Sequence, residues 1–206
     1  MSSRLTYLLG SQHEQWKYSE PYLAFITPEI IANVVIAAAV EYFDGLVDKV
    51  VWDMFAGIGT DAIRLARVSG KVICTEINKD TFEELESNTR TMDMDNMKLL
   101  CGDCADFISS IDCDIIYFDP PWGDTFQSGM DFDFSNVILN NGKSVLELVK
   151  DIQKKGHIII KSPFSSDSFE KILNPDDIIG ISAFRQQKLK FIFVRGGTST
   201  DPTLSH

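Results

Sequence analysis

The sequence predicts one α/β domain: a mostly parallel seven-stranded sheet with an antiparallel last strand, preceded by a small helical extension. Short apolar segments alternate with helical ones along most of the 206 residues, which is typical of parallel strands covered by helices on both faces. The last two apolar segments are joined by the polar "RQQ", which indicates an antiparallel pair. A composition that is 44% hydrophobic is enough for one sizeable core.

The first long helix is expected in "TPEIIANVVIAAAVEYF", where Thr27 is the candidate N-cap and Pro28 suits the first helical position. This apolar run is too short and too polar to span a bilayer, so no membrane partner is expected. We expect residues 1–27 to form an N-terminal extension or flap, residues 28–197 the domain, and residues 198–206 a disordered tail.

The remaining elements follow from the same periodicity. Helices are expected between the strands, at residues 57–69, 80–94, 143–154 and 165–173, with a long loop at 123–142. A sheet of this kind binds its ligands beyond the carboxyl ends of its strands. The strands are expected at residues 49–55, 71–77, 97–102, 114–120, 157–163, 177–184 and 189–196.

Charge and cysteine usage limit the class of protein. A net charge of −11 argues against a general nucleic-acid binder, although residues 143–195 hold ten Lys or Arg against six Asp or Glu. The four scattered cysteines and the absence of a recognisable secretory leader indicate a reduced, intracellular protein, nuclear or cytoplasmic, with a viral source left open. "CGDC" has no further ligands at a suitable spacing, so no metal site is expected.

The segment "DMFAGIGTDA" leaves the first strand and enters a helix. Gly57 and Gly59 would let the backbone approach a ligand at the helix N-terminus. Glu76 follows at the end of the next strand, where an acid can accept hydrogen bonds from ribose hydroxyls. This pattern alone fits a dinucleotide site, or a tight strand-to-helix turn with no ligand.

Four acids decide between the possible cofactors. Asp53, Glu76, Asp103 and Asp119 end four successive predicted strands. A cleft lined by carboxylates suits a sulfonium cation and is poor for a pyrophosphate, so S-adenosylmethionine is the expected cofactor. The expected cofactor-binding residues are Asp53, Phe55, Gly57, Gly59, Thr60, Glu76, Ile77, Asp103, Cys104 and Asp119.

The segment "IIYFDPPWGDTF" indicates a pocket for an aromatic amine. Asp119 and the Pro120 carbonyl can accept hydrogen bonds from an NH2 group, and the two prolines hold these acceptors still. Trp122 can stack on the ring that carries the amine. Asp119, Pro120 and Trp122 are therefore the catalytic candidates, and a proline-rich turn with a buried tryptophan is the alternative.

From 27 to 196 the chain resembles the RNA cap guanine-N2 methyltransferases, the trimethylguanosine synthases. "ITPE" is similar to the family's "VTPE", "DMFAGIGT" resembles "DAFCGVGG", "CGD" and "PPWG" match, and "QQKLKFIFVRG" is similar to "NNKLKTITAYFG". The resemblance implies a Rossmann-like class I methyltransferase fold. It also implies that Asp53, Glu76 and Asp103 bind S-adenosylmethionine, that Trp122 stacks on 7-methylguanine and that Asn88 contacts this base.

The chain departs from the family's pattern in three places. Asp119 stands where many members have Ser, and Asp124 where they have a second Gly. Phe164 lies near the position of their phosphate-contacting Arg, which Lys161, Lys188 or Lys190 would replace. Two further sequence features leave alternatives open. Phe126 is part of a lid over the base or an ordinary loop anchor. Trp16 and Lys17 form part of an N-terminal flap over the cap, or have no contact with it. The expected substrate-binding residues are Thr27, Asn88, Trp122, Phe126, Lys161, Lys188 and Lys190.

The sequence thus predicts N2-methylation of the 7-methylguanosine cap of RNA, by a monomer whose partner is capped RNA. An adenine-N6 or ribosomal guanine-N2 methyltransferase is the alternative enzyme, because "DPPW" suits amino groups on other bases. The alternative from another class is a degenerate methyltransferase fold that serves as an RNA-binding scaffold.

Overall fold

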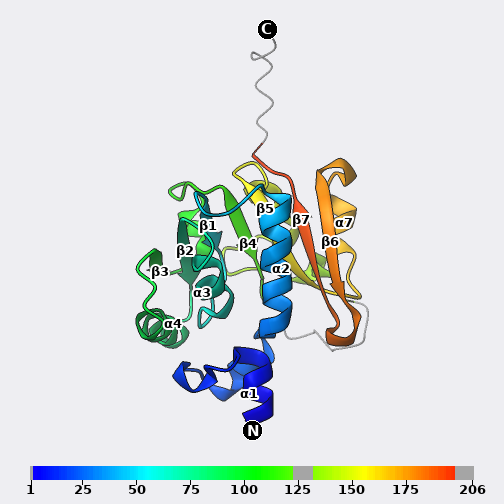
Figure 1. The fold of residues 1–206 in the computed structure, drawn as a ribbon. Helices are drawn as coiled ribbons and strands as arrows, with labels where there is room; N and C mark the ends of the chain where they lie inside the picture. The colour runs from blue at the N-terminus through cyan, green and yellow to red at the C-terminus, as the bar shows by residue number, and fades with distance from the viewer. Residues whose placement is uncertain (1, 123–131, 198–206) are drawn as a thin grey trace.

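The computed structural model describes residues 2–122 and 132–197, which form one seven-stranded sheet covered by helices (Figure 1). The strand order is β3-β2-β1-β4-β5-β7-β6, with β1 to β5 parallel and β7 antiparallel to both β5 and β6. The predicted mostly parallel sheet with an antiparallel last strand is confirmed. The strands are β1 Val50–Asp53, β2 Lys71–Glu76, β3 Met97–Cys101, β4 Ile115–Phe118, β5 His157–Pro163, β6 Ile178–Phe184 and β7 Leu189–Val194.

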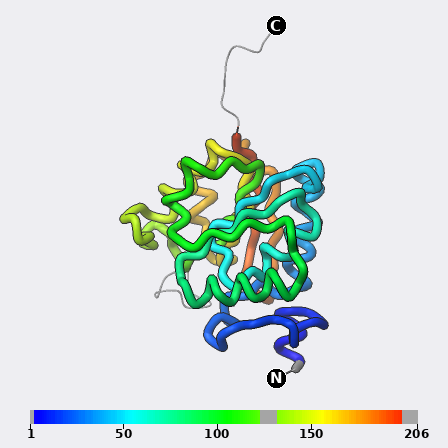
Figure 2. Tube along the Cα trace, turned by 90° about the vertical axis from the view of Figure 1, so that its left-hand side faces the viewer, coloured from blue at the N-terminus to red at the C-terminus, as the bar shows by residue number. Residues whose placement is uncertain are grey.

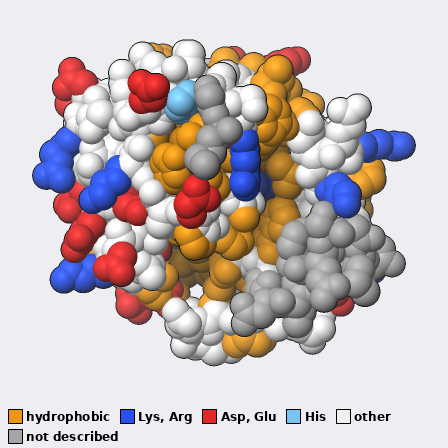
Figure 3. Space-filling model, turned by 90° about the horizontal axis from the view of Figure 1, so that it is seen from below, with side chains coloured by type: hydrophobic (Ala, Val, Ile, Leu, Met, Phe, Trp, Pro, Cys, Tyr) orange, Lys and Arg blue, Asp and Glu red, His pale blue; other side chains and the backbone are white. Residues whose placement is uncertain are grey.

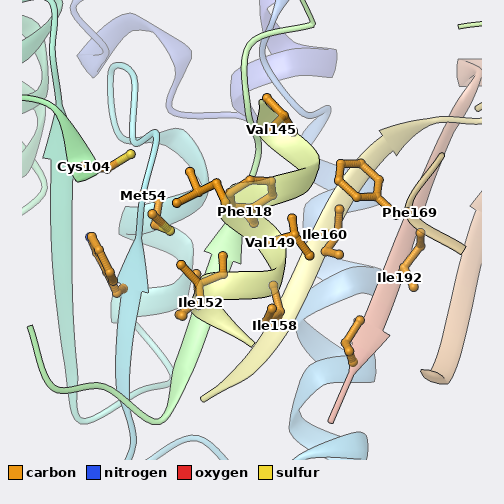
Figure 4. Close-up of a cluster of buried hydrophobic side chains, with 14 of the residues drawn as sticks. Met54, Cys104, Phe118, Val145, Val149, Ile152, Ile158, Ile160, Phe169 and Ile192 are labelled. Atoms are coloured by element: carbon orange, nitrogen blue, oxygen red, sulfur yellow. The ribbon is translucent and has the colours of Figure 1, made fainter. Parts of the chain in front are cut away.

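Helices cover both faces of the sheet because successive strand side chains point to opposite faces. On β4, Ile115 and Tyr117 pack with α2 (Glu29–Tyr42), α3 (Thr60–Ala66) and α4 (Lys79–Thr91). Ile116 and Phe118 pack on the other face, against α5 (Cys104–Phe107), α6 (Val145–Ile152) and α7 (Ser168–Ile172). Figure 4 shows this second cluster, in which Phe118, Val149, Ile158 and Phe169 meet. Among the described residues, no helix is long and apolar enough to cross a membrane.

The N-terminal extension contains α1 (Ser2–Leu9) and two 3-10 turns, His13–Gln15 and Glu20–Ala24. Its apolar residues pack against the loop after β1, α3 and the end of α4. Figures 1 and 2 place it at one end of the molecule, below the helices and strands of the domain. Trp16 is 8% exposed inside this cluster, and the backbone of Lys17 is bound to Asn88, so both hold the extension on the domain.

Element boundaries differ from the prediction for local reasons. α2 begins at Glu29 with Pro28 outside it, and the predicted N-cap is wrong, because the Thr27 hydroxyl donates to Asp61 Oδ2 at 2.7 Å instead. α3 begins three residues later than expected, at Thr60, since Gly57 and Gly59 have φ values of +55° and +90°. Ser144 and Glu147 form a capping box, so α6 begins at Val145 and not at Lys143.

Candidate active site

A cavity of about 1100 Å³ lies between the carboxyl ends of the parallel strands and the N-terminal extension. Figure 3 views this end of the molecule, where hydrophobic side chains gather around a hollow among charged ones. Pockets for a single drug-sized ligand measure roughly 300–1,000 Å³, so this one has room for a cofactor and a base together. Of the predicted residues, it is lined by Asp53, Phe55, Gly57, Thr60, Glu76, Ile77, Asp103, Cys104, Asp119, Pro120, Trp122, Lys161 and Lys188.

The glycine loop and Glu76 form one wall. The Gly57 N–H donates to Glu76 Oε2 at 2.9 Å, and the Asn78 N–H donates to Oε1 at 2.8 Å. Burial raises the pKa of the Glu76 carboxyl, and these hydrogen bonds oppose the rise. Each carboxylate oxygen keeps a second lone pair, so Glu76 can still accept from a ligand hydroxyl. Gly59 does not line the cavity; it makes the turn into α3, with Leu85 packed against it.

Two more carboxylates stand at the ends of β1 and α3. Asp53 is 2% exposed, and burial, followed by the charges of Asp61 and Asp119, raises the pKa of its carboxyl well above the usual value. Asp61 was not among the sequence candidates, yet it lines the cavity and accepts hydrogen bonds from Thr27 Oγ1 at 2.7 Å and Tyr117 OH at 3.1 Å. Carboxylates held this close together favour a ligand with a positive charge.

Asp103 and Cys104 lie at the start of α5. Asp103 Oδ1 accepts a hydrogen bond from the Ala105 N–H at 2.9 Å and so caps this helix. Asp103 also lines the cavity. Burial, followed by the charge of Asp103, raises the pKa of the Cys104 thiol to about 12. Cys104 is therefore a neutral thiol in the cavity wall.

The predicted amine pocket contains an ion pair between Lys161 and Asp119. Lys161 Nζ donates to Asp119 Oδ2 at 2.6 Å and to the Phe25 carbonyl oxygen at 3.1 Å. It also lies 5.9 Å from the centroid of the Trp122 ring. Burial raises the pKa of Asp119 to about 6, and Lys161 opposes this rise. Lys161 was expected to contact cap phosphates; at 4% exposed and paired with Asp119, it is not available for that.

Other predicted substrate contacts lie outside the cavity. The Asn88 side chain is fully buried, accepts from Lys17 N at 2.7 Å and donates to the carbonyls of Lys17 and Ile58 at 2.9 Å, so the expected base contact is wrong. Thr27 is also fully buried and is bound to Asp61. Lys190 is 6% exposed and pairs with Glu170, away from the cavity. Phe126 falls outside the described residues.

The extension supplies cavity residues that sequence reasoning missed. Tyr22 lies against Gly57, and burial, followed by the charge of Glu76, raises the pKa of its hydroxyl. Phe25 is 67% exposed at the same cavity, where Arg4 also lies. A signal for Asp61 was present in the sequence, since "GTDA" puts an acid in the first turn of the helix. For Tyr22 the sequence offered no comparable signal.

The comparison with protein families shows to which family the chain belongs. Residues 48–177, more than half of the chain, match the model of a family described as RNA cap guanine-N2 methyltransferase. The chain belongs to the RNA cap guanine-N2 methyltransferase family. The resemblance seen in the sequence is therefore confirmed.

Curated relatives match this family member at lower identity. An uncharacterised protein of Acanthamoeba polyphaga mimivirus, L320, is 27% identical over 153 residues, which cover 71% of this chain and 58% of that protein. An uncharacterised RNA methyltransferase of Clostridium tetani is 30% identical over 106 residues, which cover 49% of this chain and 23% of that protein. The chain thus spans less than two thirds of either relative.

Solved structures agree on the fold. A protein of Pyrococcus horikoshii, provisionally described as an RNA methyltransferase, superposes with a TM-score of 0.65 at 16% identity, covering 95% of this chain and all of that one. A Neisseria gonorrhoeae protein described as an S-adenosylmethionine-dependent methyltransferase gives 0.57 at 17% identity, over 85% and 71% of the two chains. At these identities the likeness establishes the fold, and the class I methyltransferase fold expected from the sequence is confirmed.

Proposed function

We propose that this family member transfers methyl groups from S-adenosylmethionine to the exocyclic N2 amine of the 7-methylguanosine cap of RNA. One observation carries the proposal. Asp119, Pro120 and Trp122 line the same cavity as Asp53 and Glu76, so an amine-binding end and a carboxylate-lined end are parts of one space. Methyl transfer needs the two ligands in contact, and a cavity that they share would bring them together.

The residues of the carboxylate-lined end fit the proposed cofactor. Glu76 would accept hydrogen bonds from the ribose, and Asp103 lines the cavity two residues beyond the end of β3, where it can meet the adenine. Asp53 and Asp61 line the cavity where the cationic amino-acid part would lie, and a bound cation there would favour the ionised form of the Asp53 carboxyl, whose pKa burial raises. When bound, S-adenosylmethionine supplies a sulfonium-activated methyl group that an amine nitrogen can take up with loss of one proton.

The amine end would orient the base. The Asp119 carboxylate and the Pro120 carbonyl would accept the two N–H bonds of the amine, which directs its weak lone pair. Trp122 would stack on the ring, and indole binds a cationic ring such as 7-methylguanine more strongly than a neutral one. Because Lys161 is paired with Asp119 at 2.6 Å, the pair presents little net charge to the stacked base.

The RNA chain would leave the cavity over its basic rim. Arg4 of the extension and Lys188, between the 3-10 turn Arg185–Gln187 and β7, both line the cavity, and Lys188 is exposed. Cations placed there would meet the phosphates of the cap and of the first nucleotides. We further propose an intracellular monomer in which residues 1–27 cover the ligands and residues 28–197 form the methyltransferase domain.

Mass spectrometry of nucleic acid incubated with the protein and S-adenosylmethionine tests the proposal. The panel is RNA with a 7-methylguanosine cap, RNA with an unmethylated cap, uncapped RNA and DNA. We expect a gain of one or two methyl groups on the 7-methylguanosine cap alone. Methylation of uncapped RNA or DNA would indicate an amine on another base, and no methylation of any member would favour an RNA-binding scaffold. Lys171→Ala, at an exposed ion pair on α7, is the control variant that should act like the parent.

A further inference from the structure

Lys161 is a buried cation whose partners all belong to the proposed amine pocket. Its side chain is 5% exposed, and its ammonium group donates to Asp119 Oδ2 at 2.6 Å and to the Phe25 carbonyl at 3.1 Å. β4 and β5 are parallel neighbours in which Phe118 pairs with Ile160, so Asp119 and Lys161 follow one step further along both strands. The sheet register therefore fixes this ion pair.

Asp119 stands in surroundings that disfavour its charge. It is desolvated, and the charge of Asp61, on α3, raises its pKa further. The charge of Asp119 in turn raises the pKa values of three acidic groups: Asp53 of β1, Tyr117 of β4 and Tyr22 of the extension. Lys161 is the cation that opposes the rise at Asp119, whose pKa is about 6, while Arg64 of α3 pairs with Asp61 at 3.5 Å. A protonated Asp119 would offer an O–H where the amine needs an acceptor.

We propose that Lys161 is a positioning residue of the methyl-acceptor pocket, which keeps the Asp119 carboxylate ionised and turned so that its other oxygen accepts an N–H of the target amine. The inference rests on the proposed function and adds a role that the phosphate-binding expectation for Lys161 did not include. The same ammonium group donates a hydrogen bond to the Phe25 carbonyl, so Lys161 links the Asp119 acceptor to the N-terminal extension. Lys161 acts through Asp119 and does not touch the reacting atoms.

Carbon-13 NMR of aspartate carboxyl groups tests this without any substrate. The Asp119 signal is assigned by its loss in Asp119→Asn, and its midpoint in the parent should lie at about 6. In Lys161→Met the midpoint should rise by at least one pH unit, whereas Lys161→Arg should keep it near the parent value. Lys161→Gln, which can still donate to Phe25, should also raise it and serves if the Met variant does not fold. An unchanged midpoint in a folded Met or Gln variant would overturn the proposal.

The pH dependence of methyl transfer then links the carboxylate to the reaction. In the parent, kcat should fall below pH of about 6, because the acceptor is lost as Asp119 protonates. In Lys161→Met the pH below which kcat falls should rise by the same amount as the NMR midpoint. Most of the activity should return at high pH. A uniform loss at every pH would mean a purely structural lysine and overturn the proposal. If the parent methylates nothing, the proposed function fails, while the NMR midpoints still decide the role of Lys161.

Discussion

The ring of Tyr22 lies on the backbone of Gly57, so that a Cβ atom on Gly57 would stand 2.8 Å from the ring carbon Cε1. Gly57 also has a φ of +55°, and its N–H donates to Glu76 Oε2 at 2.9 Å. One contact therefore joins the N-terminal extension, the glycine loop and the acid that we propose binds the cofactor ribose. The extension is thus part of the site in this structure.

Gly57→Ala should weaken S-adenosylmethionine binding at least tenfold, because the new methyl group would displace Tyr22 from the cavity wall. It should also destabilise the fold by about 1–2 kcal/mol through the left-handed backbone conformation. Gly45→Ala is the matched control, with a φ of +88° and nothing within 4 Å of the new Cβ. Calorimetry and thermal unfolding of both variants separate the two effects. Equal affinity in Gly57→Ala and Gly45→Ala would show that the Tyr22 contact does not matter for the cofactor.

Glu76→Ala should lower both affinity and stability. The lost ribose contact, a hydrogen bond to a charged group, is worth about 1.5–3 kcal/mol, which is at least tenfold in the S-adenosylmethionine dissociation constant. The N–H groups of Gly57 and Asn78 would also lose their acceptor. Glu76→Gln keeps one acceptor oxygen and should bind with intermediate affinity, and Glu83→Ala, exposed on α4, should change neither quantity. Parent-like calorimetric affinity in Glu76→Ala would mean that the cofactor lies elsewhere.

Lys188 and Lys190 should behave differently although they are two residues apart. Lys188→Ala should weaken the binding of capped RNA and lower the slope of log K against log salt by about one, because Lys188 is an exposed cation at the cavity and would meet a phosphate. Lys190→Ala should leave that slope unchanged and destabilise the protein by about 1–3 kcal/mol, since it leaves Glu170 unpaired at a partly exposed site. Salt titrations and urea unfolding of the two variants measure this. A lower salt slope in Lys190→Ala would instead indicate that the RNA contacts the protein beside α7.

The sequence predicted the sheet and the carboxylate-lined wall because both follow from local patterns. Strand ends are marked where an apolar run stops, so Asp53, Glu76 and Asp119 could be placed at one edge without knowing any contact. β7 was correctly expected to be antiparallel because "RQQ" is too short for any other connection. Gly57 was recognised as a point of close approach, and in this structure the ring of Tyr22 approaches it.

The rest of the site depends on contacts between distant segments, which no local pattern records. The Lys17 backbone that occupies Asn88 is 71 positions away, and the Phe25 carbonyl that binds Lys161 is 136 positions away. A polar residue in a helix reads the same in sequence whether it faces a ligand or a buried backbone. For the same reason Lys161, Lys188 and Lys190 were equivalent candidates until the structure showed which of them is exposed.

The central claim is that the cavity holds a 7-methylguanosine base on Trp122, and calorimetric titration with 7-methyl-GTP and GTP tests it most directly. Stacking is worth about 1–3 kcal/mol and a desolvated cation–π contact up to about 2 kcal/mol, which only the methylated ring receives. The parent should bind 7-methyl-GTP more tightly than GTP. Trp122→Ala should weaken the binding of 7-methyl-GTP by about ten- to several-hundred-fold and reduce the preference for it over GTP. Trp122→Phe should keep part of the affinity and part of the preference. A parent that binds the two nucleotides equally, or a Trp122→Ala variant that binds 7-methyl-GTP like the parent, would contradict the account.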